Sequence, residues 1–291
     1  MEKVEIKVLG KEYWPPLLKE IPDPPEKLYI RGAVPDWEQK FLCVVGARRW
    51  TSYGKEVCEK LIAGLRGYPI TIVSGLALGI DSIAHKAALA AGLKTLAVPG
   101  SGLLPEAIHP RIHRILADKI VEAGGALLSE FEPDFRATLW AFPQRNRIMA
   151  GLANATLVVE AEKKSGTLIT SKLATEYNRD VLTIPGSIFS PNSEGPHLLI
   201  RLGATPITSP AELLEALGFK IEAENSQTQL ALAYSDCSPD EKKILELLRE
   251  PLARDALISK LEFPASRTNA LLSVLEIKGL IKESMGELHL S

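Results

Sequence analysis

Short apolar runs alternate with amphipathic stretches between about residues 41 and 217, and most breaks carry glycine or proline. Such runs predict strands buried on both faces, and the stretches between them predict helices. The predicted strands are FLCVV from Phe41, ITIVS from Ile70, KTLAV from Lys94, ALLSE from Ala126, ATLVVE from Ala155 and VLTIP from Val181. Buried strands separated by helices indicate a mostly parallel sheet with right-handed crossovers, which is a Rossmann-like, doubly wound α/β fold.

The pattern changes toward both ends of the chain. A proline-rich start predicts an extended arm laid over the main domain, and a polar stretch without apolar periodicity predicts a linker. Helices are predicted at 239–249, 253–261 and 264–278, and a hairpin is predicted around Met285 and Gly286. Three helices and a β-hairpin are typical of a winged-helix domain. The expected division is therefore an arm (1–39), a Rossmann-like domain (40–218), a linker (219–237) and a small C-terminal winged-helix domain (238–291).

Composition narrows the class of protein. The 291 residues are 46% hydrophobic and 24% charged, as in a globular protein of more than one domain. The start MEKVEIKVLG has no apolar signal-peptide core, and no run approaches the roughly 20 apolar residues that cross a bilayer. We therefore expect a cytoplasmic protein without a membrane segment. Cys43, Cys58 and Cys237 lie far apart without a CxxC spacing, which predicts reduced thiols and no thiolate metal site.

Glycines and basic residues gather in the loops that follow the predicted strands, where a doubly wound sheet binds its ligands. Glycine allows a backbone N–H to approach a phosphate closely, and a helix that begins there adds its positive dipole end. The net charge of −2 means that a nucleic-acid site must come from basic residues gathered on one surface. Residues in or just after these loops would form such a basic rim: Arg48, Arg145, Arg147, Lys163, Lys164 and Lys172. Repeated anion sites favour a polyanionic strand over a single mononucleotide.

Four aromatic residues lie near the basic loops in the sequence: Trp50, Tyr53, Trp140 and Phe142. Stacking of a base on an aromatic ring contributes roughly 1–3 kcal/mol. Each of these side chains is equally consistent with a role in capping the core, so the sequence leaves both interpretations open.

The segments VVGARRWTSYG, VSGLALGIDSIAH, FPQRNRIMAGL, SGTLITSKLATEYNRDV and IPGS resemble, in order and spacing, the motifs of the DNA-processing protein A (DprA/Smf) family. The arm segment YWPPLLKEIPDPPEKLYIRG and the C-terminal region are also similar to that family. The resemblance implies an extended Rossmann fold, a homodimer, binding of single-stranded DNA, and transfer of the strand to the RecA recombinase during natural transformation (competence) or DNA recombination. Many family members begin with a helical domain, whereas only the arm precedes the sheet here, so contacts of that domain are not carried over.

We therefore expect a non-catalytic protein that needs neither a cofactor nor a metal and that holds the DNA backbone at the carboxyl edge of the sheet. The resemblance implies phosphate contacts from Arg48, from the loop 165–167 and from Lys172. The full set of expected DNA-binding residues is Gly46, Arg48, Arg49, Ser74, Gly75, Arg145, Asn146, Arg147, Lys164, Ser165, Gly166, Thr167, Thr170 and Lys172.

The same residues give less support to alternative functions. The related LOG-type nucleoside-monophosphate phosphoribohydrolases use a glutamate in a PGGxGTxxE loop, and Thr170 stands at its place here. No GxxxxGK[ST] motif exists for an ATPase, and Arg48 interrupts a dinucleotide-binding glycine pattern. A winged-helix regulator of duplex DNA is a further alternative, but few basic residues surround Arg267 on the third helix. His109 and His113 have zinc-ligand spacing, yet no third ligand is indicated.

Overall fold

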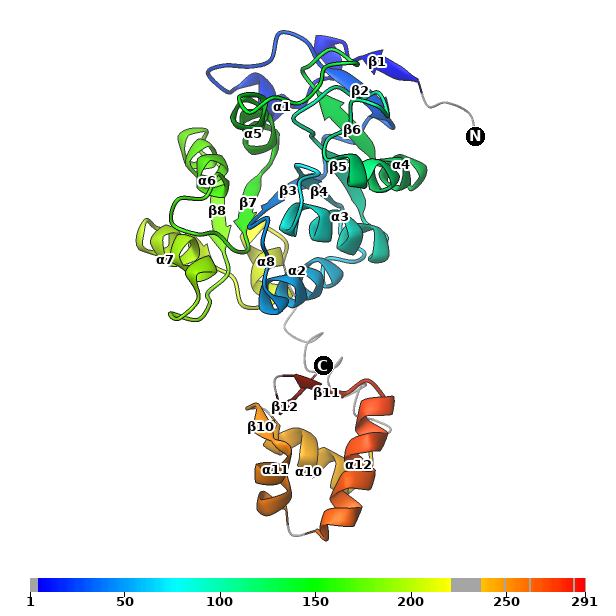
Figure 1. Cartoon of the computed structure of the whole chain (residues 1–291), viewed down its shortest axis with the longest axis vertical. Helices are drawn as coiled ribbons and strands as arrows, with labels where there is room; N and C mark the ends of the chain where they lie inside the picture. Colours follow the sequence, from blue (N-terminus) through cyan, green and yellow to red (C-terminus); the bar gives the residue numbers. More distant parts are fainter. Residues whose placement is uncertain (1–4, 221–236, 249, 262, 285, 291) are drawn as a thin grey trace. The chain divides into compact units, whose positions relative to one another are not determined.

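The computed structural model describes residues 5–220, 237–248, 250–261, 263–284 and 286–290. The chain divides into two compact units, Met1–Lys220 and Ile221–Ser291, each with its own sheet (Figure 1). Apart from its ends, the linker expected at 219–237 lies outside the described residues. Within the described residues no helix is both long enough and apolar enough to span a bilayer.

The first unit contains a nine-stranded sheet with the order β1-β2-β6-β5-β4-β3-β7-β8-β9. Its strands are β1 (Ile6–Val8), β2 (Tyr29–Gly32), β3 (Lys40–Val45), β4 (Ile70–Ser74), β5 (Lys94–Ala97), β6 (Ala126–Ser129), β7 (Ala155–Val158), β8 (Asp180–Thr183) and β9 (Thr205–Pro206). All six predicted strands are present, and every pairing from β6 through β9 is parallel. The expected doubly wound, mostly parallel fold is confirmed.

The order of the strands defines one position in this sheet at which a ligand site is expected. From β3 the chain adds β4, β5 and β6 on one side, then crosses to β7 on the other side of β3. The loops after β3 and β7 therefore leave the sheet in different directions at their carboxyl ends. Open α/β sheets bind ligands at this topological switch point.

Helices cover both faces of the sheet. The helices are α1 (Pro16–Lys19), α2 (Ser52–Ala63), α3 (Ile80–Ala90), α4 (Arg114–Glu122), α5 (Ala141–Leu152), α6 (Thr167–Glu176), α7 (Glu194–Arg201) and α8 (Pro210–Ala216). One layer holds α8, α2, α3 and α4 as successive neighbours, and the other holds α1, α5 and α6 (Figure 1). Both layers bury apolar faces against strands that are themselves apolar, as the continuous hydrophobic runs require.

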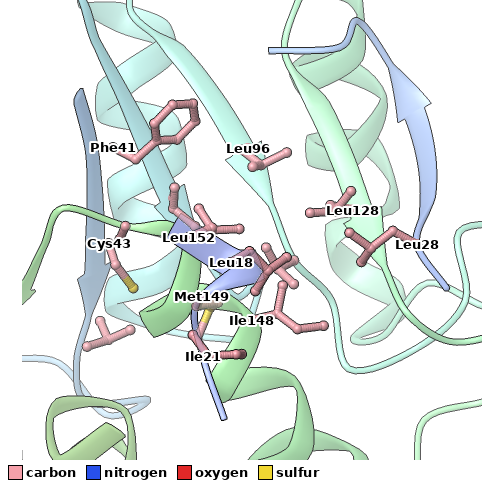
Figure 2. Packing of buried hydrophobic residues seen from close by; sticks show 14 of the residues in the cluster. Leu18, Ile21, Leu28, Phe41, Cys43, Leu96, Leu128, Ile148, Met149 and Leu152 are labelled. Atoms are coloured by element: carbon pink, nitrogen blue, oxygen red, sulfur yellow. The ribbon is translucent and has the colours of Figure 1, made fainter. Parts of the chain in front are cut away.

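The first 39 residues differ from the predicted arm because they complete the sheet and its core. Strand β2 pairs antiparallel with β6, and β1 pairs antiparallel with β2. Figure 2 shows Leu18 and Ile21 packed beside Ile148 and Met149 of α5. Gly151 permits this contact, since a Cβ there would lie 2.8 Å from Ile21 Cγ2. Strands of three and four residues are too short to show a period of two, which explains why the sequence pattern missed them.

The second unit has the expected winged-helix composition. It consists of α10 (Pro239–Leu247), β10 (Leu252–Ala253), α11 (Arg254–Lys260), α12 (Ala265–Ile277), β11 (Ile281–Ser284) and β12 (Glu287–Leu290). The hairpin β11–β12 pairs with β10 in a three-stranded sheet. Helix α10 begins with a capping box between Ser238 and Glu241, and its Ile244 packs with Leu257 and Leu272 in a separate core.

Candidate nucleic-acid interface

A cavity of about 610 Å³ opens at the switch point between β3 and β7. Its volume falls in the range of sites that enclose a small ligand or one nucleotide. The loop after β3, the start of α5 and the loop before α6 line it together. The polar and charged lining residues are Arg48, Arg49, Asp81, Arg145, Asn146, Glu162, Ser165, Thr167 and Thr170.

The loop after β3 is held in one conformation by close packing and backbone hydrogen bonds. Gly46 lies so near α3 that an added Cβ would be 2.7 Å from Ile80 Cγ1. The amide of Ile80 donates to the carbonyl of Ala47 at 3.2 Å. Farther along, Asn192 Nδ2 donates to the carbonyl of Arg49 at 2.9 Å. The side chains that this loop presents are therefore carried on a fixed backbone.

Arg48 and Arg49 are both exposed, and both line the cavity. The guanidinium of Arg48 lies over the ring of Phe142, with Cζ 5.6 Å from the ring centre. Among residues 5–220, neither arginine belongs to an ion pair, unlike Arg147 and Lys172. Two cations at the rim of a cavity, without carboxylate partners in that part of the chain, attract an anionic ligand.

The loop before α6 lines the cavity beside the loop after β3. Ser165 Oγ accepts a hydrogen bond from the amide of Thr167 at 3.2 Å, and Thr167 Oγ1 donates to the carbonyl of Gly46 at 3.2 Å. Gly166 occupies the N-cap position without a capping side chain, and an added Cβ there would meet no atom within 4 Å. The loop is thus joined to the loop after β3, and the backbone at Gly166 is accessible to a phosphate.

Arg145 forms the floor of the cavity. It is 4% exposed, and its Nη1 donates to the carbonyl of Gly75 at 2.7 Å and to the carbonyl of Val98. The neighbouring Asp81 accepts from the amide of Gly75 at 3.1 Å. Burial raises the pKa of the Asp81 carboxyl, and the positive charge of Arg145 opposes that rise. Burial likewise lowers the pKa of Arg145, opposed by the Asp81 carboxylate. These two groups form the floor of the cavity, and the exposed Arg48 and Arg49 form its rim.

Most of the residues predicted to bind DNA come together at this cavity. Those that line it are Gly46, Arg48, Arg49, Arg145, Asn146, Ser165, Gly166, Thr167 and Thr170. They come from three segments, 46–49, 145–146 and 165–170, which the parallel sheet brings to one edge. Whether each of them contacts DNA stays a prediction.

Three predicted residues are used inside the protein instead. Ser74 is buried, and its Oγ donates to the carbonyl of Val44 at 2.7 Å. Both backbone groups of Gly75 are occupied by Arg145 and Asp81. Arg147 donates to Glu130 and to the carbonyl of Asp23. Ser74 and Gly75 therefore belong to the support of the cavity.

The guanidinium of Arg147 is buried and paired with acidic and backbone oxygens. It donates to Glu130 Oε2 and to the carbonyl of Asp23, the latter at 2.9 Å. Its Nε lies 3.4 Å from Asp23 Oδ2. Because this charge is neutralised inside the fold, we exclude Arg147 from the expected phosphate contacts.

Lys164 and Lys172 are exposed but do not line the cavity. Lys172 follows the cavity-lining Ile169 by one helical turn, so it lies farther along the same face of α6. Its side chain is 77% exposed, and its Nζ is 3.6 Å from Glu176 Oε1. Such an exposed ion pair is weak, so Lys172 remains a predicted phosphate contact at the rim of the cavity.

Several residues that build the site were not singled out by the sequence. Leu139 and Glu162 line the cavity, and Asn192 and Glu160 fix the loop after β3. No local pattern marks them, because their partners lie far away in the sequence. The zinc spacing of His109 and His113 gathers no metal site, since no group of three potential ligands occurs among the described residues.

Comparison with known proteins identifies related families. The profile of the family described as DNA recombination-mediator protein A matches residues 5–218, and the profile described as DprA winged helix domain matches residues 226–287. Protein Smf of Escherichia coli (strain K12) is 46% identical over 212 residues, which cover 72% of this chain and 55% of that protein. Protein Smf of Synechocystis sp. is 36% identical over 94% of this chain and 76% of its own. The chain thus spans about half the length of the first relative and about three quarters of the second.

Solved structures agree with these matches. The X-ray structure of DNA processing protein A from Streptococcus pneumoniae has a TM-score of 0.69 and 39% identity, and the match covers 76% of each chain. DNA processing protein A from Helicobacter pylori, described for its single-stranded DNA binding mode, has a TM-score of 0.64 and 29% identity. That match covers 73% of this chain and 95% of the other.

Proposed function

The chain belongs to the DNA recombination-mediator protein A family, and from this premise we propose that its sheet domain binds single-stranded DNA without converting it chemically. The binding site in this proposal is the cavity at the switch point, together with its basic rim. The observation that carries it is that Arg48 and Arg49 line the same cavity as the exposed Gly166 at the start of α6.

Each part of the cavity suits one part of a nucleotide chain. The accessible backbone at Gly166, at the positive dipole end of α6, and the two rim guanidinium groups suit phosphate oxygens. The ring of Phe142, which lines the cavity beside Arg48, offers a surface on which a base can stack. In a duplex the bases are paired and stacked inside the helix, so this contact favours a single strand.

A relative supports the same ligand. The Helicobacter pylori protein, which shares the fold at 29% identity, is described as binding single-stranded DNA. The proposed contacts of this chain are those predicted residues that line the cavity, with Lys164 and Lys172 at its rim.

The winged-helix unit is a less suitable site for duplex DNA. Arg267 on α12 pairs with Asp240, and Arg254 on α11 pairs with Glu276 and Glu283 at 3.1 and 2.8 Å. Cations that are already paired contribute less to binding of phosphates. We therefore assign strand binding to the sheet domain.

Under this proposal, the protein does not hydrolyse nucleotides at the cavity. Thr170, which lines it, has a hydroxyl in the position where the LOG-type hydrolases carry a glutamate. Incubation of the protein with nucleoside monophosphates tests this directly. Release of free base and ribose phosphate, abolished in Asp81→Asn or Glu162→Gln, would replace the binding proposal with an enzymatic one.

We further propose that the chain forms a homodimer in the cytoplasm and delivers the bound strand to the RecA recombinase during transformation or recombination. The family description as a recombination mediator supports this step. Light scattering measures the mass in solution. The rate at which RecA assembles on strands covered by single-strand-binding protein should rise when this protein is added, and an unchanged rate would contradict the delivery role.

Fluorescence anisotropy of labelled oligo-dT and of a duplex of equal length tests strand binding. Wild type is expected to prefer the single strand, with an affinity that falls linearly with the logarithm of salt concentration. Equal affinity for the two ligands, or a signal insensitive to salt, would contradict the proposal.

A further inference from the structure

Three consecutive residues in the segment after β3 are exposed. Arg48 and Arg49 line the cavity, and Trp50, which follows them, does not. We propose that Trp50 and Tyr53 form a second stacking site for nucleobases, outside the cavity at the start of α2. The bound strand then continues from the cavity past Arg49 onto this surface. The inference rests on the proposed function and extends the contact surface beyond the one nucleotide that the cavity can enclose.

Trp50 is presented to solvent by a backbone that is fixed on both sides. The carbonyl of Arg49 accepts from Asn192, and the amide of Thr51 donates to Glu160 Oε2 at 3.0 Å. Glu160 is itself buried, so this anchor is shielded from water. Although its backbone is held in this way, the indole stays 45% exposed. An exposed aromatic ring on a rigid backbone loses little entropy when a base stacks on it.

A basic side chain accompanies the indole. Lys55 Nζ lies 5.9 Å from the centre of the Trp50 ring, and Arg49 precedes that ring in the chain. Lys55 also pairs with Glu59 at 3.9 Å, but such a long, exposed pair is weak. A groove that binds single strands without sequence preference combines cations for the phosphates with aromatic rings for the bases. The charge around Trp50 is therefore complementary to a nucleic-acid strand.

Tyr53 is the second residue of α2, three positions after Trp50, and its side chain is held by a hydrogen bond. Its hydroxyl donates to the carbonyl of Pro185 at 2.6 Å, and the residue is 45% exposed. Burial, and then the nearby Glu160 carboxylate, raise the pKa of this phenol. The ring therefore stays neutral and does not repel phosphates at physiological pH. Phe189, four residues after Pro185, is a further exposed aromatic residue in this part of the chain, with 91% of its surface accessible.

The test compares two lengths of oligo-dT, about four and about twelve nucleotides, because the longer strand can reach beyond the cavity. Trp50→Ala should weaken binding of the longer strand roughly tenfold and change binding of the shorter strand little, as expected for the loss of one stacked base. Trp50→Phe, which retains an aromatic ring, should bind the longer strand nearly as well as wild type. An abasic strand of the longer length should bind wild type and Trp50→Ala equally.

Tryptophan fluorescence gives a second readout. In a Trp140→Phe background, the longer strand should quench the emission, and Trp50→Phe in that background should abolish the quenching.

The proposal is overturned if Trp50→Ala binds the longer strand like wild type, which would favour a protein partner for this surface. Arg48→Ala distinguishes binding at the cavity from stacking on Trp50, because loss of a cavity contact should weaken binding of both the shorter and the longer strand. If wild type fails to bind any single strand, the proposed function fails first.

Discussion

The guanidinium carbon of Arg48 lies 5.6 Å from the centre of the Phe142 ring, which links the loop after β3 to the first turn of α5. The aromatic face holds the cation at the rim by a cation–π contact, and no carboxylate in residues 5–220 pairs with it. Arg48 is thus oriented for a phosphate, and Gly100 lies close to the same ring, with its ideal Cβ position 2.7 Å from Phe142 Cδ1.

Arg48→Ala should weaken binding of oligo-dT at every salt concentration and reduce the slope of log affinity against log salt by about one unit. The reason is that one phosphate contact, with its released counterion, is lost. Anisotropy over a salt series measures both effects. Lys60→Ala removes an equal charge from an exposed position on the last turn of α2 and serves as the control. An equal loss in both variants would indicate a general charge effect.

Gly166→Ala should weaken binding of single-stranded DNA roughly tenfold, because a methyl group at the start of α6 blocks the approach of a phosphate to the backbone. The fold should tolerate the change, since φ at Gly166 is −59° and no atom lies within 4 Å of the new Cβ. Urea denaturation checks the stability and anisotropy checks the binding. Unchanged affinity in a stable variant would remove this loop from the site.

Arg48 and Arg147 were both predicted to bind DNA from the sequence, but only Arg48 lines the cavity. Both arginines lie in segments that follow predicted strands, and both are basic residues in family-like motifs. Only the fold brings Glu130 and Asp23 to Arg147, and the nearer of them is 17 residues away in the chain. A local pattern predicts that a strand ends and a loop begins, but it does not predict which charges are neutralised by distant partners.

The same limit applies to the first 39 residues. The six central strands were predicted because each is a continuous apolar run, long enough to stand out from its flanks. Strand β2 pairs with β6, whose residues follow about 100 positions later, and β1 pairs with β2 in turn. Leu18 and Leu28 are fully buried by this long-range packing. The prolines correctly indicated breaks, but they did not indicate that the pieces between them enter the core.

Arg147→Met should lower the free energy of unfolding by about 3–5 kcal/mol, because it leaves the buried carboxylate of Glu130 without its cation. Affinity for oligo-dT, measured under conditions where the variant is folded, should stay close to that of wild type. The double variant Arg147→Met with Glu130→Gln removes the unpaired charge and should recover part of the stability. A variant that is stable but binds DNA poorly would restore Arg147 to the binding site.

His85 is a buried histidine with an unusual environment. Its Nδ1 lies 2.7 Å from Thr95 Oγ1, and its Nε2 has no hydrogen-bond partner. Thr95 Oγ1 donates to the carbonyl of Ile72, so Nδ1 carries the proton and donates to Thr95. Burial first, and then the nearby His113, lower the pKa of His85 from 6.5 to about 3. The imidazole therefore stays neutral in the folded protein at moderately acidic pH.

This shift makes the stability depend on pH. Below about pH 6.5 the unfolded chain protonates His85 and the folded chain does not, so the free energy of unfolding falls as pH falls, by about 1.4 kcal/mol per pH unit. Urea denaturation at about pH 7 and about pH 5 should show that wild type loses about 2 kcal/mol more than His85→Gln, which cannot titrate at this position. Other titrating groups, including Asp81 with its raised pKa, are common to both proteins and cancel in the comparison. Identical pH dependence of the two proteins would mean that His85 takes up its proton equally well in the folded state.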